Sequence, residues 1–267
     1  MAEIIKGVVF DWAGTTVDFG CFAPVAAFRE AFRKAGVEVT LEETRAPMGM
    51  LKIDHIRTML AMPGVKARWE SAHGRVPTDA DAEAIYRDFE PALFSVLENH
   101  CEVKPGLLEA LAALRAQNLR IGSTTGYTKK MMAVVERLAR EAGYAPEVVA
   151  TAEDVGGFGR PWPFMVFKNM RELELPAVRA VVKVGDTVSD IREGVAAGVW
   201  SVGVVDGSSV MGLTRVEFEA LTPEAREAER SRVRRVFEEA GADAVINDLT
   251  ELPALIGRLD EEAKKAK

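Results

Sequence analysis

The stretch VVFDWAGTTVDFG, from Val8 to Gly20, begins with three apolar residues and then changes to polar residues and glycines. A short apolar run bounded in this way predicts a buried strand that ends at Phe10, with Asp11 in the loop that follows. Ligands of an open parallel sheet bind beyond the carboxyl ends of its strands. Asp11 is therefore a candidate functional carboxylate, whereas Ala13, two places further on, offers no titratable side chain.

Short apolar runs recur along the chain, and segments with helical periodicity separate them. The runs predict strands at residues 4–10, 119–123, 148–151, 180–184, 201–205 and 244–246. The periodic segments predict helices at residues 106–116, 129–142 and 190–197. Strands that alternate with helices indicate an α/β fold, here a Rossmann-like core with a mostly parallel sheet.

Residues 21–100, between the first two predicted strands, show no convincing strand pattern. The sequence there predicts helices at 22–35 and 48–62, a capping box formed by Thr40 and Glu43, and a longer helix that begins near Thr78. We expect this segment to be an inserted all-helical cap domain, with residues 1–20 and 101–267 forming the catalytic core. Residues 214–240, which are charged and helical, are expected to be a surface excursion of the core.

The composition is that of a globular chain with a substantial core, because 48% of the 267 residues are hydrophobic and 28% are charged. A net charge of −7 without a basic stripe argues against nucleic acid as a partner. No run reaches the roughly 18 apolar residues of a membrane helix, and no signal-peptide pattern precedes the first strand. We therefore expect a cytoplasmic protein without a membrane partner, and free thiols at its two cysteines.

Polar residues follow the carboxyl ends of several predicted strands. Asp11 follows the first strand and Thr125 the second, Arg160 lies in GRPWP, and Asp186 and Asp190 lie in VGDTVSD. Carboxylate oxygens bind Mg²⁺, and a guanidinium can donate two parallel hydrogen bonds to phosphoryl oxygens. The set predicts a Mg²⁺-dependent phosphoryl-transfer site with Asp11 as nucleophile. Each motif taken singly is also typical of a turn, a cap or a surface residue.

The order and spacing of DWAGT, STTG, GRPWP and VGDTVSD resemble the four motifs of the haloacid dehalogenase superfamily, D-x-D-x-T, Ser/Thr, Lys/Arg and G-D-x-x-x-D. The resemblance implies that the insert is the helical cap of that family. Phosphatases of the superfamily use the second aspartate of the first motif as a general acid, a kind of catalysis that contributes about 10²- to 10⁴-fold in rate. Ala13 cannot donate a proton. The chain is then either an unusual phosphatase of small phosphate esters or an enzyme that activates its leaving group by other means.

The segment APMGMLKIDHIRTML offers such a means. If residues 48–62 form one helix, Met48, Lys52, His55 and Met59 share one face. An amine enclosed by a cap can condense with a carbonyl. A pKa lowered by about 3 units from the usual value of about 10.4 would raise the neutral fraction of the amine about a thousandfold at pH 7. The alternative is a surface lysine whose stem packs on the methionines.

The stretches DWAGTTVDFGCFAP, PMGMLKIDHIR, GSTTGYT and VGDTVSDIREG are more specific, and they are similar to the phosphonoacetaldehyde hydrolase (phosphonatase) family. The resemblance covers most of the chain and implies hydrolysis of the C–P bond of phosphonoacetaldehyde, in the degradation of 2-aminoethylphosphonate. It implies that Lys52 forms a Schiff base with the aldehyde and that Asp11 takes the phosphoryl group. It also implies a Mg²⁺ site formed by Asp11, the backbone carbonyl of Ala13 and Asp186, and a homodimer through cap helices.

The remaining roles follow from the same scheme. His55 is expected to shuttle protons, Arg160 to hold the phosphonate, and Asp190 to orient the loop or a metal-bound water. His73 and His100 are expected to be surface groups without partners. Contacts with the substrate are assigned to Thr125, Gly126, Tyr127, Met48 and Cys21.

Overall fold

The computed structural model describes residues 4–265 and contains a six-stranded sheet in the order β3-β2-β1-β4-β5-β6. All neighbouring strands pair in parallel, with β1 between β2 and β4. The predicted α/β fold with a parallel sheet is confirmed. The strands are β1 (Gly7–Phe10), β2 (Arg120–Thr125), β3 (Val148–Thr151), β4 (Val181–Gly185), β5 (Trp200–Val204) and β6 (Ala244–Ile246).

The first strand was predicted to begin at residue 4, but it begins at Gly7. The backbone N–H groups of Ile4 and Ile5 donate to the Oδ1 atom of Asp260, at 2.5 and 2.9 Å, instead of to a neighbouring strand. The ends of the other predicted strands agree with the structure to within two residues. Asp11 therefore leaves the central strand at the carboxyl edge of the sheet, as expected.

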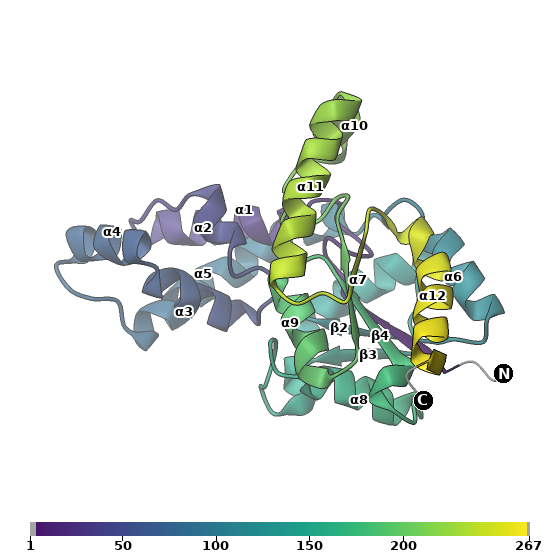
Figure 1. The fold of residues 1–267 in the computed structure, drawn as a ribbon. Coiled ribbons are helices and arrows are strands. Elements are labelled where there is room, and N and C mark those ends of the chain that lie inside the picture. Colours follow the sequence, from purple (N-terminus) through teal and green to yellow (C-terminus); the bar gives the residue numbers. More distant parts are fainter. Residues whose placement is uncertain (1–3, 266–267) are drawn as a thin grey trace.

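Helices cover both faces of the sheet (Figure 1). Val8 and Phe10 of β1 pack in the cluster that includes Leu111 and Leu255, whereas Val9 packs with Val166 on the opposite face. This alternation is the period of two that a strand imposes on its side chains. The helices of the core are α6 (Leu107–Ala116), α7 (Lys129–Glu141), α8 (Phe164–Glu172), α9 (Val188–Ala197), α10 (Arg215–Ala220), α11 (Pro223–Glu239) and α12 (Leu252–Lys265), with 3₁₀ turns at Ala152–Val155, Val178–Ala180 and Leu249–Glu251.

A group of helices inserted between β1 and β2 extends to one side of the sheet (Figure 1). The rings of Phe28 and Phe89 stack at its centre, with centroids 4.2 Å apart. We refer to residues 21–100 as the cap. These boundaries are the ones that the sequence predicts. The helices are α1 (Phe22–Lys34), α2 (Leu41–Arg45), α3 (Lys52–Ala61), α4 (Pro63–His73) and α5 (Asp79–Leu97), followed by a 3₁₀ turn at Glu98–His100.

Two helix predictions differ from the structure. The predicted helix at 48–62 is wrong at its start, because α3 begins at Lys52 and Gly49 has a positive φ of 88°. Pro47 and Gly49 both disfavour a continuous helix there. The predicted helical segment 214–240 consists of two helices, since Leu221 is extended and Pro223 starts α11. The capping box of Thr40 and Glu43 is confirmed at the start of α2.

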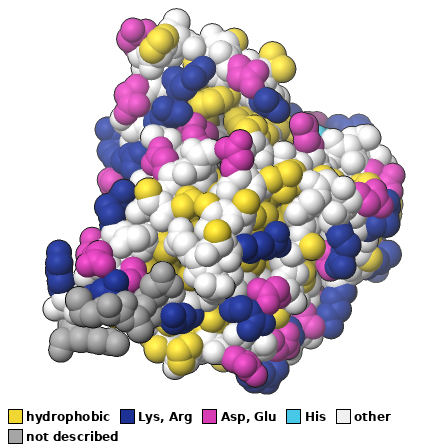
Figure 2. All heavy atoms as spheres, turned by 90° about the vertical axis from the view of Figure 1, so that its right-hand side faces the viewer, with side chains coloured by type: hydrophobic (Ala, Val, Ile, Leu, Met, Phe, Trp, Pro, Cys, Tyr) yellow, Lys and Arg dark blue, Asp and Glu magenta, His cyan; other side chains and the backbone are white. Residues whose placement is uncertain are grey.

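Charged side chains of both signs are interspersed on the face shown in Figure 2, and neither sign forms a continuous field there. The hydrophobic side chains visible on this face lie between them. In the described part of the chain, from residue 4 to residue 265, no helix combines the length and the apolar character that a membrane crossing requires.

Candidate active site

Asp11 is held at the carboxyl edge of the sheet by its own backbone. Its N–H donates to the carbonyl of Val184 in β4 at 2.9 Å, and its carbonyl accepts a hydrogen bond from Thr16 Oγ1 at 3.0 Å. The residue is only 4% exposed. The loop that follows β1 therefore fixes the Asp11 carboxylate between the two central strands.

Asp186 follows β4 and faces the same place. Thr15 Oγ1 donates to its Oδ1 at 2.8 Å, and the N–H of Ser209 donates to its Oδ2 at 2.7 Å. A Cβ atom on Gly14, whose φ is 94°, would lie 2.1 Å from Oδ2, so only glycine fits there. Burial raises the pKa of Asp186 well above its usual value, and the charge of Asp11 raises it further.

Asp190 completes a cluster in which oxygens of Asp11, Asp186 and Asp190 lie within 4.8 Å of one another. Its Oδ2 accepts a hydrogen bond from Thr187 Oγ1 at 2.6 Å, which caps α9, and its Oδ1 lies 2.6 Å from Lys183 Nζ. Burial alone would raise the pKa of Asp190, but the charges of Arg160 and Lys183 outweigh it and hold that pKa below its usual value. The carboxylate is thus ionised and already partnered, which suits a supporting role.

Arg160 lies at the centre of a buried ion-pair network. Its Nη1 is 2.7 Å from Asp11 Oδ1 and 3.0 Å from Asp190 Oδ1, and its Nε is 2.9 Å from Glu193 Oε2. Nη2 donates to the carbonyl and the hydroxyl of Thr124, at 2.8 and 2.7 Å. Burial would lower the pKa of Arg160, but the surrounding carboxylates raise it. The guanidinium therefore binds carboxylates on one side and the end of β2 on the other.

Sequence reasoning missed two members of this network. Glu193 accepts hydrogen bonds from Arg160 and from Thr124 Oγ1, and Lys183 Nζ lies 3.5 Å from Glu193 Oε2. Both side chains are fully buried. A lysine inside the apolar run VVKVG was the available signal, since buried lysines are rare unless they are paired. Glu193 carried a weaker signal, because its spacing of three residues from Asp190 places both on one helix face.

Lys104 is another buried amine that the sequence analysis did not single out. Its Nζ donates to the carbonyls of Gly14 and Asp206, which belong to the loops after β1 and β5. Burial lowers its pKa to about 8. Lys104 thus joins the loop that carries Asp11 to the loop that follows β5.

Lys52 is the first residue of α3 and is 3% exposed. Its Nζ lies 4.8 Å from the ring centroid of Tyr127 and 5.9 Å from that of Phe28, so the amine lies between a core residue and a cap residue. Burial lowers the pKa of Lys52, while the charges of Asp11 and Asp186 oppose this effect. The positive end of the α3 dipole also disfavours an ammonium at this position.

His55 lies one turn further along α3 and is completely buried. Its ring stacks on Phe28, with centroids 3.8 Å apart and planes inclined at 23°. Nε2 lies 2.9 Å from the carbonyl of Thr44, an acceptor, so Nε2 carries the proton and Nδ1 is a free acceptor. Nδ1 is buried and has no partner among the described residues. Burial, and then the charge of Lys52, hold the pKa of His55 well below its usual value, so the ring is neutral.

The turn after β2 brings the core against the cap. Thr125 Oγ1 accepts a hydrogen bond from the N–H of Tyr127 at 3.1 Å. A Cβ atom on Gly126 would lie 2.5 Å from the carbonyl oxygen of Met50 and 2.8 Å from that of Gly49. Glycine is therefore required where the cap loop rests on the core.

Cys21 and Met48 are buried together and pack with Val25 of α1 and with Ala13. Burial, and then the charge of Asp18, raise the pKa of Cys21 well above its usual value, so it is a thiol. Met48 precedes α3 and therefore does not share the helix face predicted for it. The predicted site residues otherwise form two adjoining groups, one around Arg160 at the strand ends and one around Lys52 in the cap.

His100 differs from its predicted role, because its Nδ1 lies 3.1 Å from Asp18 Oδ1. His73 also has a partner, since its Nε2 lies 2.9 Å from the carbonyl of Ala35. The sequence could have indicated the partner of His100. His100 lies at one predicted boundary of the cap, and Asp18 lies near the other, where the chain first leaves the core.

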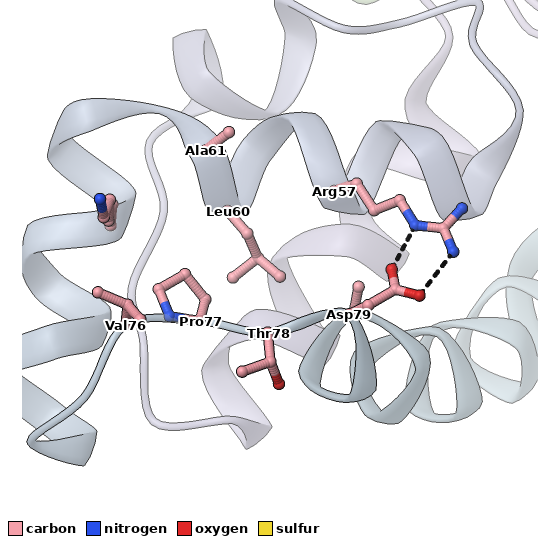
Figure 3. A pocket seen from close by; sticks show the side chains of 9 residues that line it. Arg57, Leu60, Ala61, Val76, Pro77, Thr78 and Asp79 are labelled. Carbon is pink, nitrogen blue, oxygen red and sulfur yellow. Dashed lines mark hydrogen bonds and ion pairs between the residues drawn. The ribbon is translucent and has the colours of Figure 1, made fainter.

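A surface pocket of about 440 Å³ lies at the other end of α3, between Leu60, Val76 and Pro77 (Figure 3). Arg57 and Asp79 pair across its edge, with Nε 2.6 Å from Oδ1. None of the predicted site residues lines this pocket. The candidate site is instead enclosed between the cap and the core.

Comparisons with known proteins show what this chain is similar to. A sequence model of haloacid dehalogenase-like hydrolases matches residues 5–198. Phosphonoacetaldehyde hydrolase from Bacillus cytotoxicus is 46% identical over 258 residues, which cover 97% of this chain and 97% of the relative. The enzyme of the same name from Lysinibacillus sphaericus is 48% identical over 97% of this chain and 96% of its own length.

A bifunctional phosphonoacetaldehyde hydrolase/aminoethylphosphonate transaminase from Clostridioides difficile is 48% identical over 264 residues, and the chain spans 41% of that longer protein. Among solved structures, a phosphonoacetaldehyde hydrolase like protein from Oleispira antarctica superposes with a TM-score of 0.96 at 36% identity, covering 100% of this chain and 96% of that one. A β-phosphoglucomutase from Clostridium difficile, with a TM-score of 0.68 and 16% identity over 97% of this chain and 98% of that one, shares the fold alone.

Proposed function

Because this chain belongs to the haloacid dehalogenase-like hydrolases, in their phosphonoacetaldehyde hydrolase branch, we propose that it hydrolyses the C–P bond of phosphonoacetaldehyde. The products are acetaldehyde and phosphate. One observation carries the proposal beyond membership of the family. A buried lysine with a lowered pKa, Lys52, adjoins a buried carboxylate cluster that contains Asp11, at a site where Ala13 supplies no acid.

The first step uses Lys52. Its neutral amine adds to the aldehyde carbon, and loss of water leaves an imine between Nζ and the substrate. Burial and the start of α3 both favour the neutral amine that this step requires. His55, with a neutral ring and a free Nδ1, can accept a proton from the amine and return it to the leaving water.

The second step uses Asp11. An oxygen of its carboxylate forms a bond to phosphorus while the C–P bond breaks. The electron pair of that bond passes into the imine, whose nitrogen takes a proton from water, to give an enamine. Protonation at carbon and hydrolysis with water release acetaldehyde and free Lys52. A second water cleaves the aspartyl-phosphate to phosphate and Asp11. Because the imine accepts the electron pair, the leaving carbon needs no proton from position 13, which accounts for Ala13.

The buried carboxylates fit a divalent cation. Around Arg160, the network and Asp186 together hold four carboxylates and two ion-paired cationic side chains. Burial, and then the charges of Asp11 and Asp190, raise the pKa of Asp186, so a cation beside this carboxylate would stabilise its ionised form. We propose that Asp11, the carbonyl of Ala13 and Asp186 hold Mg²⁺. When bound, Mg²⁺ would offset the charge that develops on the phosphoryl oxygens.

The other site residues position the substrate. Arg160 is proposed to bind a phosphoryl oxygen through Nη1, which would exchange one of its present partners, Asp11, Asp190 or the carbonyl of Gly49, for the substrate. Asp190 holds Arg160 in place. The hydroxyl of Thr125 and the N–H of Gly126 are proposed as further phosphoryl contacts. The side chains proposed to enclose the two-carbon unit are Tyr127, Met48 and Cys21.

Borohydride trapping tests the proposal. The protein is incubated with Mg²⁺ and phosphonoacetaldehyde, reduced, digested and analysed by mass spectrometry, with Lys52→Arg as the matched control. We expect a two-carbon or phosphonoethyl adduct on Lys52 of the wild type and none in the variant, which should also release no phosphate. Turnover without an adduct would exclude the imine. Preference for an ordinary phosphate ester would instead support a phosphatase without a Schiff base.

Two further expectations stay predictions. A homodimer through the cap helices is predicted from the family resemblance, and sedimentation velocity or light scattering would measure the mass of the particle in solution. Cytoplasmic localisation is predicted from the sequence, and fractionation of the native host would test it.

A further inference from the structure

Arg45, the last residue of α2, connects the cap to two segments outside it. Its Nη1 donates to the carbonyl of Gly20 at 2.8 Å and to the carbonyl of Ser209 at 3.1 Å. The guanidinium also lies over the ring of Phe22, with its carbon 4.9 Å from the ring centroid. None of the steps proposed above uses this residue.

Ser209 stands between Arg45 and a carboxylate of the active site. Its carbonyl accepts the hydrogen bond from Arg45, and its N–H donates to Asp186 Oδ2 at 2.7 Å. The residue is buried, in the loop after β5. The backbone of Ser209 therefore contacts Arg45 of the cap through its carbonyl oxygen and Asp186, a proposed metal ligand, through its N–H.

Gly20 lies at the predicted boundary of the cap, where the chain leaves the core. Its φ is 86°, its N–H donates to the carbonyl of Gly207 at 2.8 Å, and its carbonyl accepts from Arg45. A Cβ atom there would lie 2.5 Å from the carbonyl oxygen of Leu213. Arg45 thus binds the backbone at Gly20, where the chain enters the cap, and the backbone at Ser209, in the loop after β5.

The surroundings are shaped for this guanidinium. A Cβ atom on Gly212, whose φ is 69°, would lie 3.0 Å from Nε of Arg45 and 3.2 Å from its guanidinium carbon. Nη2 is buried and has no partner among the described residues. Burial lowers the pKa of Arg45, and the charges of Asp18 and Asp186 oppose this effect. Such a buried cation is retained only where the structure compensates it with polar partners.

We propose that Arg45 is a positioning residue that holds the cap closed on the core and, through Ser209, keeps Asp186 in its ligand orientation. The inference rests on the proposed function, because closure brings Lys52 of the cap to the carboxylates of the core. An arginine suits this role better than a lysine, because its planar group makes both hydrogen bonds through Nη1 and also packs on the ring of Phe22. Arg45 itself touches neither the substrate nor the reacting atoms.

Two variants of Arg45 and one control test the proposal. Arg45→Met removes the donors, and Arg45→Lys keeps the charge. Arg68→Met is the control, because Arg68 of α4 binds Glu43 of the same helix α2 at a distance from the site. Thermal unfolding of all three variants shows whether each is folded before activity is compared.

We expect Arg45→Met to lower kcat/KM for phosphonoacetaldehyde by about 10- to 100-fold, with kcat and KM both affected, as for other changes that disturb closure. Arg45→Lys should recover part of the loss. Arg68→Met should stay within about twofold of the wild type. An Arg45→Met variant with wild-type kinetics would overturn the proposal.

Hydrogen–deuterium exchange supplies a measurement that needs no substrate. We expect faster exchange in Arg45→Met than in the wild type at residues 44–51 and 206–213, and no change there in Arg68→Met. Unchanged exchange at residues 206–213 would overturn the link to Asp186, even if activity fell. If Arg45→Met does not fold, the same comparison with Arg45→Lys decides. If the wild type does not release phosphate from phosphonoacetaldehyde, the proposed function is wrong. The exchange measurement would still test whether Arg45 holds the cap on the core.

Discussion

Oδ1 of Asp11 lies 2.7 Å from Nη1 of Arg160, and neither side chain is open to solvent. The same guanidinium holds Glu193 and Thr124 through its other donors, so the position of the proposed nucleophile, Asp11, depends on an entire planar group. A lysine at position 160 can keep the charge but cannot make these contacts together.

We therefore predict that Arg160→Lys lowers kcat by at least about 10²-fold, because a misplaced nucleophile loses alignment with phosphorus. The unfilled hydrogen bonds should also lower the free energy of unfolding by about 1–3 kcal/mol. Phosphate release and urea denaturation measure the two effects. Arg171→Lys, at a side chain that is 79% exposed, is the control and should change neither. Wild-type kcat in Arg160→Lys would show that the fork is not needed.

A second prediction concerns the buried lysine in β4. Lys183→Met leaves Asp190 and Glu193 with less compensating charge, so we expect the free energy of unfolding to fall by about 3–5 kcal/mol. Lys130→Met removes the exposed pair with Glu90 and should cost less than about 1 kcal/mol. Urea denaturation of both variants gives the comparison. Equal losses in the two variants would contradict the importance of burial.

A third prediction concerns the contact between the cap loop and the turn after β2. Gly126→Ala would place a methyl group 2.5 Å from the carbonyl oxygen of Met50, so the cap must shift, and we expect kcat/KM to fall by about 10²-fold. Gly257→Ala is the control, because nothing lies within 4 Å of its Cβ position in α12. It should leave the kinetics unchanged and add about 0.5–1 kcal/mol of stability. An active Gly126→Ala enzyme would mean that the cap seats differently during turnover.

A fourth prediction concerns the response to metal. Mg²⁺ at about 100 times its Kd should stabilise the wild type by about 2.7 kcal/mol, observed as a rise in Tm. Asp186→Asn should abolish this response. In excess EDTA the same variant should be at least as stable as the wild type, because it removes a carboxylate whose ionised form burial, and then the charge of Asp11, disfavour in the folded state. A variant that still responds to Mg²⁺ would place the metal elsewhere.

A fifth prediction concerns pH. The hydrogen bond with Asp18 raises the pKa of His100, although partial burial opposes it, so the folded state favours the protonated ring. The stabilisation should be fully present below the ordinary pKa of about 6.5 and disappear as pH rises through the higher pKa of the folded state. We expect the difference in Tm between the wild type and His100→Gln to shrink between pH 5.5 and pH 9. A constant difference would exclude the ion pair.

Much of the fold could be predicted from local pattern. The six strands were recognisable because buried parallel strands are short apolar runs. β1 begins later than predicted, and the N–H groups of Ile4 and Ile5 before it donate to Asp260, some 250 residues away in the chain. Residues 21–100 show no strand pattern because the structure there consists of helices, α1 to α5. The start of α3 was misplaced because a helical period was extended across Gly49.

The candidate site divides in the same way. Asp11, Arg160, Asp186 and Lys52 were identifiable because they lie in motifs that resemble a known family. Glu193, Lys183 and Arg45 were missed, since their roles arise from contacts between segments far apart in the chain, which no local period encodes. Residues that support a site are thus harder to predict than residues that act in it.

The central place of β1 in the sheet has a consequence for biosynthesis. Its two neighbours, β2 and β4, begin at Arg120 and Val181, so β1 leaves the ribosome long before either partner exists. At about 5–20 residues per second, the delay before β2 is made is at least several seconds. During this interval the helices of residues 21–100, whose contacts are local, can form first. The apolar run that becomes the middle of the sheet is therefore exposed in the nascent chain, and it is the segment that a chaperone would be expected to bind.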